Sequence, residues 1–232
     1  MKQLKPNDKR AKAAMLMVCI VMGFEIVNII SDFFQYQLLE SGNLNSEIAN
    51  ENDIRQALVA LVSTVLFIVS AITFIMWFRR ASYNLHTKVD HLKHSEGWAA
   101  GCWFVPVLCW FRPFQIMKEL YEETDVLLER ETRNYEKRIT TSILGLWWTI
   151  WVLRNVIGQF LMRGAFKAET ADQLSVSTVG SMISSGLQIL LGFITVKIIR
   201  DYSKIEPLFY EIKEPPTLTF PDRVFADDQT KI

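Results

Sequence analysis

Five polar or charged side chains interrupt apolar stretches in which such groups are rare, namely Glu25, Asn28, Arg154, Asn155 and Gln188. Glu25 and Asn28 are three residues apart, which places them on one face of a helix. Glu25 and Arg154 lie at similar distances from the basic ends of their own apolar segments, so both would sit at nearly the same depth in a bilayer. A lone charge at that depth is costly and normally pairs within the protein. The sequence therefore predicts a Glu25–Arg154 ion pair, with the three amides as neighbouring hydrogen-bonding groups.

Two interpretations of this polar cluster compete. In the first, its interhelical hydrogen bonds fix the register of the helices and contribute about 0.6 to 2 kcal/mol each. In the second, the cluster lines a path for a proton or a small solute. The structural interpretation is favoured because the five residues are expected to form one tier at mid-depth, whereas a path requires a file of polar groups leading from side to side.

No familiar arrangement of catalytic residues accompanies the cluster. The chain has no Gly-x-Ser-x-Gly turn, no phosphate-binding glycine-rich loop and no His-Glu-x-x-His pair. Its histidines and cysteines lack the short spacing of a zinc site, and the cysteines fall in apolar stretches, which argues against a disulfide framework. These residues are His86, His91, His94, Cys19, Cys102 and Cys109. We therefore expect no enzymatic activity, no metal and no cofactor, and an enzyme acting on lipid headgroups is the third alternative.

The polar cluster must be held by apolar helices, and four segments have the required length. They are residues 13–38, 56–78, 141–162 and 175–199. The hydrocarbon core of a bilayer is about 30 Å thick and takes about 20 apolar residues of helix. The first segment follows a basic N-terminal stretch, residues 1–12. The sequence predicts an all-α integral membrane protein with four transmembrane helices in two hairpins.

The distribution of basic residues predicts the orientation of the chain. All but four of the 25 lysines and arginines fall in segments that share one side if the chain crosses the membrane four times. Such residues concentrate on the cytoplasmic side, so both termini are expected there. The 25 acidic residues cancel the basic charge, which argues against nucleic acid as a partner. Residues 201–232 carry four prolines among mixed charges and are expected to form an extended cytoplasmic tail.

The two hairpins are joined by residues 97–111, the densest run of Trp, Phe and Pro in the chain. The apolar part of this run would rise only about 20 Å as a helix, less than the thickness of the hydrocarbon core. Pro106 further disfavours a straight helix, because its ring clashes with the preceding turn. We expect a re-entrant or interfacial segment that enters and leaves on the cytoplasmic side. Pro113 then suits the first turn of an amphipathic helix over residues 113–134, which would lie on a membrane surface or on other helices.

The motifs around this segment occur in a distinctive order. They are Trp77-Phe78-Arg79-Arg80-Ala81 with Asn84, Gly97-Trp98-Ala99, Trp103-Phe104-Val105-Pro106-Val107-Leu108, and Arg112-Pro113-Phe114-Gln115 leading into Lys118-Glu119. Over roughly residues 60–200 the chain thereby resembles the bacterial membrane family called domain of unknown function 4328. Cys109 departs from the pattern, since the family commonly carries Asn there. The resemblance implies a topology and no activity.

The leading functional hypothesis is a non-enzymatic membrane module that engages lipid or another membrane protein through the Trp- and Pro-rich segment. Its partners would be the bilayer of a bacterial inner membrane, anionic lipid headgroups or a second membrane protein. The residues of this region that belong to the family motifs or are expected at the membrane interface are Arg79, Arg80, Asn84, Trp98, Trp103, Pro106, Arg112 and Pro113. The rival hypothesis is a small-solute or proton transporter that uses Glu25 and Arg154.

Overall fold

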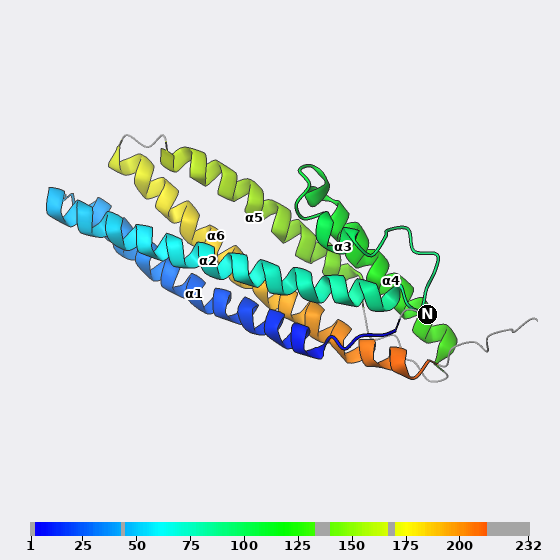
Figure 1. The fold of residues 1–232 in the computed structure, drawn as a ribbon. Helices are drawn as coiled ribbons and strands as arrows, with labels where there is room; N and C mark the ends of the chain where they lie inside the picture. Colours follow the sequence, from blue (N-terminus) through cyan, green and yellow to red (C-terminus); the bar gives the residue numbers. More distant parts are fainter. Residues whose placement is uncertain (1–2, 43–44, 133–139, 167–169, 213–232) are drawn as a thin grey trace, which may run out of the picture.

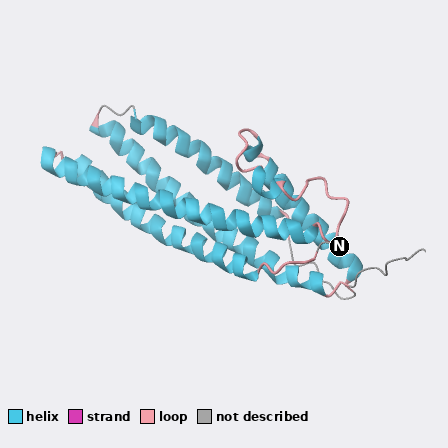
Figure 2. Ribbon diagram, viewed as in Figure 1, coloured by secondary structure: helices cyan, strands magenta, loops and turns pink. Residues whose placement is uncertain are grey.

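The computed structural model describes residues 3–42, 45–132, 140–166 and 170–212, and within these residues all regular structure is helical. The longest helices of this described part are α1 (Asp8–Ser41), α2 (Ser46–Leu85), α5 (Ser142–Phe166) and α6 (Ala171–Ile205). They run side by side as an elongated bundle (Figure 1; Figure 2). α1 packs against α2 and α6, and α5 packs against α6, so α6 lies between α1 and α5.

Local signals in the sequence set the ends of these helices. Gly42 ends α1 in the left-handed backbone conformation, with φ 64°, which a residue without a Cβ adopts at little cost. Asn45 begins α2, and its side-chain oxygen accepts a hydrogen bond from Ile48 N at 2.8 Å. Thr170 begins α6 in the same way, with Gln173 N as the donor at 3.3 Å. Both side chains satisfy amide groups that the first turn of a helix leaves without a partner.

Three helices of the described chain are long and apolar enough to cross a membrane, namely α1, α2 and the helical stretch Ala171–Tyr210. Large apolar side chains also cover the outer surface of the bundle. Examples are Ile26, Leu61, Phe160 and Phe193. An apolar exterior of this extent marks contact with a membrane or with other proteins. Together with the three long apolar helices, it indicates a membrane protein.

The connection between α2 and α5 is an insertion beside the end of the bundle where the N-terminus lies (Figure 1). It contains α3 (Trp98–Gly101), the 3₁₀ helix η1 (Leu108–Trp110) and α4 (Arg112–Glu131). α4 is amphipathic, as the sequence predicts for this stretch, and its last predicted residues, 133–134, lie outside the described part. The insertion thus builds a separate layer on one end of an otherwise simple bundle.

The apolar face of α4 packs on other helices. Tyr121 Oη donates a hydrogen bond to Ile198 O at 2.9 Å, and Thr124 Oγ1 lies 3.2 Å from Tyr202 Oη. All three side chains involved are completely or almost completely buried. These contacts tie α4 to α6, so this helix belongs to the core at the terminal end of the bundle.

The chain after Arg200 differs from the predicted extended tail. α6 continues to Ile205 and passes into the 3₁₀ helix η2 (Glu206–Tyr210). Tyr202, Ile205 and Phe209 are completely buried. The prediction of an extended segment is therefore wrong for residues 201–210, because their apolar side chains recur at helical spacing and fill the core against α2 and α4. Residues 213–232 of the predicted tail lie outside the described part of the chain.

Candidate functional site

Segment 97–111 consists of short helical turns that are broken beside Pro106. Neither α3 nor η1 exceeds four residues. Val107, directly after the proline, has φ 70°, a backbone conformation that is rare for a β-branched residue. The predicted interruption of the helix is confirmed. The side chains at this break are largely uncovered by the rest of the protein, since Phe104 is 76% exposed and Val107 is 70% exposed.

The base of the segment is fixed in the bundle by aromatic contacts. Cys102 is completely buried. The next residue, Trp103, meets the rings of Phe74, Trp148 and Trp151 edge-on, with centroid distances of 5.9, 6.4 and 6.2 Å. Each pair of this kind contributes about 0.5–1.5 kcal/mol beyond its buried area. A fixed base therefore presents an exposed apolar tip, which we define as residues 104–107.

The two tryptophans that flank the tip differ in their surroundings. Trp98 is 40% exposed at the start of α3. Trp110 ends η1, and its carbonyl oxygen accepts a hydrogen bond from Trp148 Nε1 at 3.1 Å. The segment is thus tied to α5 after the tip as well as before it.

Arg112 follows the segment and is held in a polar network. Its Nη1 donates to His94 Nε2 at 2.9 Å, and His94 Nδ1 lies 2.6 Å from Glu119 Oε2. This arrangement assigns the proton of a neutral His94 to Nδ1, because Nε2 must accept from the guanidinium. Pro113 is buried in the first turn of α4. The predicted headgroup contact of Arg112 therefore competes with a hydrogen bond inside the protein.

The two motif arginines at the end of α2 have different environments. Arg79 is exposed, whereas Arg80 is half-buried with its guanidinium carbon 6.0 Å from the centre of the Tyr83 ring. Only Arg79 has the free, outward position that contact with a headgroup requires.

Asn84 ties three parts of the chain together. Its side chain accepts from Lys5 N at 3.0 Å and donates to Lys5 O at 2.8 Å and to Glu206 Oε1 at 2.7 Å. Asn7 Nδ2 donates to the same carboxylate at 3.2 and 3.0 Å. All three side chains of this set, which we call the terminal knot (Asn7, Asn84 and Glu206), are more than nine-tenths buried. The knot joins the N-terminal stretch, α2 and η2.

Comparison with known proteins places the chain in a family. Residues 40–204 match the model described as Domain of unknown function (DUF4328). The chain belongs to the DUF4328 family. No curated protein and no solved structure matches it. The match runs from the end of α1 through almost all of α6, so it includes Asn84 and segment 97–111, whereas Glu25 and Glu206 lie outside it.

The predicted ion pair of this DUF4328 protein is not a direct contact, although the charges of Glu25 and Arg154 lie close enough to interact electrostatically. Within the described residues Glu25 instead accepts a hydrogen bond from Asn28 Nδ2 at 3.0 Å, and no oxygen of Glu25 lies within 4 Å of an Arg154 nitrogen. The buried Nε of Arg154 has no hydrogen-bond partner in the described part. Asn155 Nδ2 bonds to Trp151 O of its own helix at 2.8 Å. A direct contact is missing because equal depth does not make two helices neighbours, and α6 lies between α1 and α5.

The polar groups also extend beyond one tier, which corrects the second sequence-based expectation. Asn28 and Ser63 exchange hydrogen bonds at 2.9 and 3.0 Å across α1 and α2. One turn further, Ser31 Oγ donates to Gln56 Oε1 at 3.3 Å, and beyond it Gln35 Nε2 donates to Thr178 Oγ1 at 2.8 Å. This polar seam (Glu25, Asn28, Ser31, Asp32, Gln35, Asn52, Arg55, Gln56, Ser63 and Thr178) leads from mid-helix to the α1–α2 turn.

The mutual hydrogen bonds of Asn28 and Ser63 predict a measurable coupling between α1 and α2. We expect Asn28→Leu and Ser63→Ala each to lower the free energy of unfolding, and their effects to be non-additive by about 0.6 to 2 kcal/mol. Chemical denaturation of the purified protein in detergent measures the full double-mutant cycle. Thr64→Ala is the matched control, because Thr64 is the exposed neighbour of Ser63 and bonds only within its own helix. Strictly additive effects would contradict the pairing.

The histidines are engaged in local contacts. His86 Nδ1 lies 2.7 Å from Ser82 O, and His86 Nε2 lies 2.8 Å from His94 O. His91 Nε2 contacts Glu123 Oε2 at 3.1 Å. Within the described ranges, no three His, Cys, Asp or Glu residues come together as metal ligands would.

Two members of the terminal knot, Asn7 and Glu206, were not recognised in the sequence. Their local signals are weak. Asn7 precedes α1 in a polar stretch, and Glu206 stands directly before a proline at the end of an apolar helix. Such positions are normally solvated, and only the packing of three distant segments buries them.

Proposed function

We propose that this DUF4328 protein is a non-enzymatic membrane module whose segment 97–111 sits in one leaflet of the bilayer and engages lipid. The observation that carries the proposal is the apolar tip, where Phe104 and Val107 are largely exposed while the adjacent Trp103 is anchored. Apolar side chains held outward on a fixed base are unfavourable in water and favourable in hydrocarbon. The flanking tryptophans suit the interface between hydrocarbon and headgroups.

In the proposed placement the chain crosses the membrane four times. The three long apolar helices provide three crossings, and α5 provides the fourth. α5 has 25 residues, enough for a hydrocarbon core of about 30 Å, and it packs along α6. Arg154 and Asn155 interrupt its apolar sequence, and Arg154 is half-buried in the bundle. The bias of lysine and arginine supports both termini, α4 and the base of segment 97–111 on the cytoplasmic side of a bacterial inner membrane.

One observation favours the rival function, a proton or small-solute transporter. The polar seam leads from Glu25 to the α1–α2 turn, so one half of the bundle has a file of polar groups. Towards the other end, the side chains of α1 that follow Glu25 are Val21, Val18 and Ala14. Most members of the seam also pair with one another. A module that only engages lipid keeps its fold and its lipid contact after Glu25→Gln, whereas a transporter loses flux in liposomes.

Insertion of the tip can be measured by the depth of a spin label. In a variant with alanine at positions 19, 102 and 109, we expect a nitroxide on Phe104→Cys to collide at least several times more often with oxygen than with a water-soluble nickel chelate. Oxygen concentrates in hydrocarbon and the chelate stays in water. His91→Cys is the control, because the His91 side chain is 72% exposed in the polar loop. Equal access of the chelate to both labels in bilayers would overturn the proposal.

A further inference from the structure

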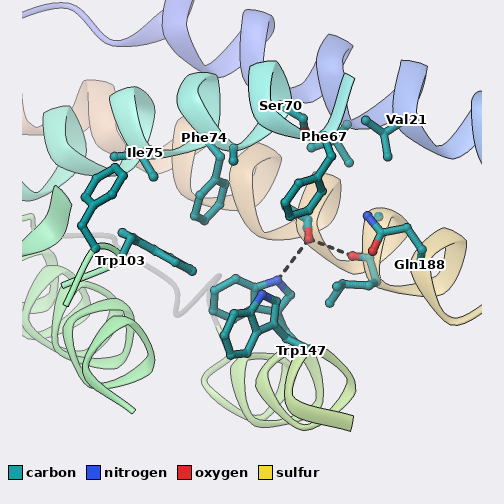
Figure 3. Close-up of a pocket in the computed structure, with 15 residues that line it drawn as sticks. Val21, Phe67, Ser70, Phe74, Ile75, Trp103, Trp147 and Gln188 are labelled. Atoms are coloured by element: carbon teal, nitrogen blue, oxygen red, sulfur yellow. Dashed lines mark hydrogen bonds between the residues drawn. The ribbon is translucent and has the colours of Figure 1, made fainter. Parts of the chain in front are cut away.

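A crevice of about 280 Å³ lies where α2 and α5 diverge. α1 and α6 form its floor, and Trp103 lies at one end while Val21 and Gln188 lie at the other (Figure 3). Its lining is predominantly apolar and includes six aromatic side chains. These are Phe67, Phe74, Trp103, Phe104, Trp147 and Trp151.

The mouth of the crevice faces the surroundings of the bundle. Phe67 on α2 and Phe104 on the tip both line it, and both have exposed side chains. At the floor, α1 and α6 approach so closely at Gly192 that an added Cβ would clash with the Met22 side chain. Helix packing therefore closes the floor of the crevice at Gly192, while the exposed Phe67 and Phe104 mark its open side.

Gln188 is a polar group without a partner in this apolar space. Its side chain is 8% exposed, and Oε1 is buried with no donor among the described residues. Two other polar groups of the lining are satisfied, since Trp147 Nε1 donates to Thr195 Oγ1 at 3.1 Å and Thr195 Oγ1 donates to Leu191 O at 2.8 Å. Trp103 Nε1, at the opposite end of the crevice, is a second buried atom without a partner among the described residues. A buried acceptor left unpaired is costly, so a molecule in the crevice gains one hydrogen bond if the Gln188 amide rotates to present Oε1 to it.

The position of Gln188 in the bundle sets the depth in the bilayer at which the hydrogen-bond donor of a ligand would lie. The contacts of Gln35 with Thr178 and of Gly192 with Met22 fix the antiparallel register of α1 and α6. Interpolation between them puts Gln188 level with Glu25, near the middle of both helices. A charged ligand group is disfavoured at that depth, whereas a neutral hydroxyl is tolerated once it is hydrogen-bonded.

We infer that the crevice binds a lipophilic phenol or hydroquinone that carries an apolar chain. The aromatic hydroxyl of this ligand donates a hydrogen bond to Gln188 Oε1. Aromatic rings favour edge-to-face and offset contacts with other rings, and Phe74, Trp147 and Trp151 supply them. The volume is slightly below the 300–1,000 Å³ or so of pockets that enclose drug-sized ligands, so the crevice accommodates a ring and leaves the chain in the bilayer. The inference rests on the proposed function only in requiring that the mouth face lipid.

The test uses two probes that differ in one group. Tritiated 4-decylphenol carries the donor, and tritiated 4-decylanisole keeps the ring and chain but has none. With the full chain in bilayer nanodiscs, we expect saturable binding of the phenol, roughly five- to tenfold tighter than that of the anisole, as one hydrogen bond predicts. Empty nanodiscs correct for partition into lipid.

Three variants separate the possible outcomes. Gln188→Leu is expected to remove the preference for the phenol and leave binding of the anisole unchanged. Ala71→Phe fills the crevice and is expected to abolish saturable binding of both probes, whereas Ala60→Phe places the same ring on the exposed face of α2 and changes neither. Equal binding of the two probes, absence of saturable binding, or binding that survives Ala71→Phe would overturn the inference. The spin-label result at position 104 is independent of these measurements, so a failure of either proposal is recognised separately.

Discussion

Replacing Asn84 by leucine is expected to lower the free energy of unfolding by roughly 2–5 kcal/mol. The substitution removes the hydrogen bond to Glu206 and both bonds to the backbone of Lys5. It leaves a buried carboxylate with Asn7 as its remaining side-chain donor. An unpaired buried acceptor costs more than the net value of the bond that it loses. Chemical denaturation in detergent, followed by loss of helical circular dichroism, measures the change.

The matched control for this variant is Asn50→Leu. Asn50 lies on the same helix but is exposed, so the same change of side chain is expected to alter the stability by no more than about 0.5 kcal/mol. Adding Glu206→Leu to Asn84→Leu removes the carboxylate that was left without its donor, and part of the lost stability is expected to return. If Asn84→Leu is no more damaging than the control, the terminal knot does not hold the chain ends together.

The pH dependence of stability provides a second readout of the knot. Glu206 lies beyond Arg200 and Lys204, outside the apolar part of α6, and burial raises its pKa to about 7, while hydrogen bonds from Asn84 and Asn7 act in the opposite direction. The folded protein therefore binds this proton more tightly than the unfolded chain does. The stability that protonation provides is fully present below about pH 4.5 and is lost as the pH rises to about 7. Glu206→Gln is expected to flatten this part of the profile.

The sequence was sufficient for the features that depend on local composition. Long apolar segments predict helices, Pro106 predicts the break in segment 97–111, and the motif order predicts the family. These predictions hold because the causes act over a few residues. Apolar periodicity decides which face of α4 is buried, and a proline interrupts a helix wherever the helix packs.

The contacts between distant segments were not predictable in this way. Depth alone suggested that Glu25 meets Arg154, but the order of helices around the bundle is set by the summed packing of all their faces. The same packing creates the polar seam and buries Glu206, whose immediate neighbours in the sequence give no sign of a buried site. It also extends α6 through residues that looked like a tail, because Tyr202 and Ile205 find a core only after α2 and α4 are in place.

The second large effect is expected at the base of segment 97–111, where Trp103→Ala should expose Cys102. The thiol of Cys102 is completely buried, and burial raises its pKa from 9.0 to about 11. Only the thiolate reacts with a maleimide. A return of the pKa to 9.0 increases the thiolate fraction near neutral pH roughly a hundredfold, and release of the base from α2 and α5 adds access of the reagent to this gain. The labelling rate of Cys102 by a water-soluble maleimide measures both, in a variant with alanine at positions 19 and 109.

Phe104→Ala is the matched control for this second prediction, because it removes an aromatic ring from the adjacent residue. Phe104 is mostly exposed, whereas Trp103 contacts Phe74, Trp148 and Trp151, so only the loss of Trp103 frees the base. Truncating the partly buried Trp103 also costs up to about 3 kcal/mol, and truncating the exposed phenylalanine costs far less. When Trp103 is intact, the labelling rate of Cys102 in the same alanine background should rise about tenfold per pH unit well below pH 11, as expected for a thiol that reacts only when ionised. A similar acceleration by both variants would mean that the tip is packed as firmly as the base, and the division into a fixed base and an outward apolar tip would be wrong.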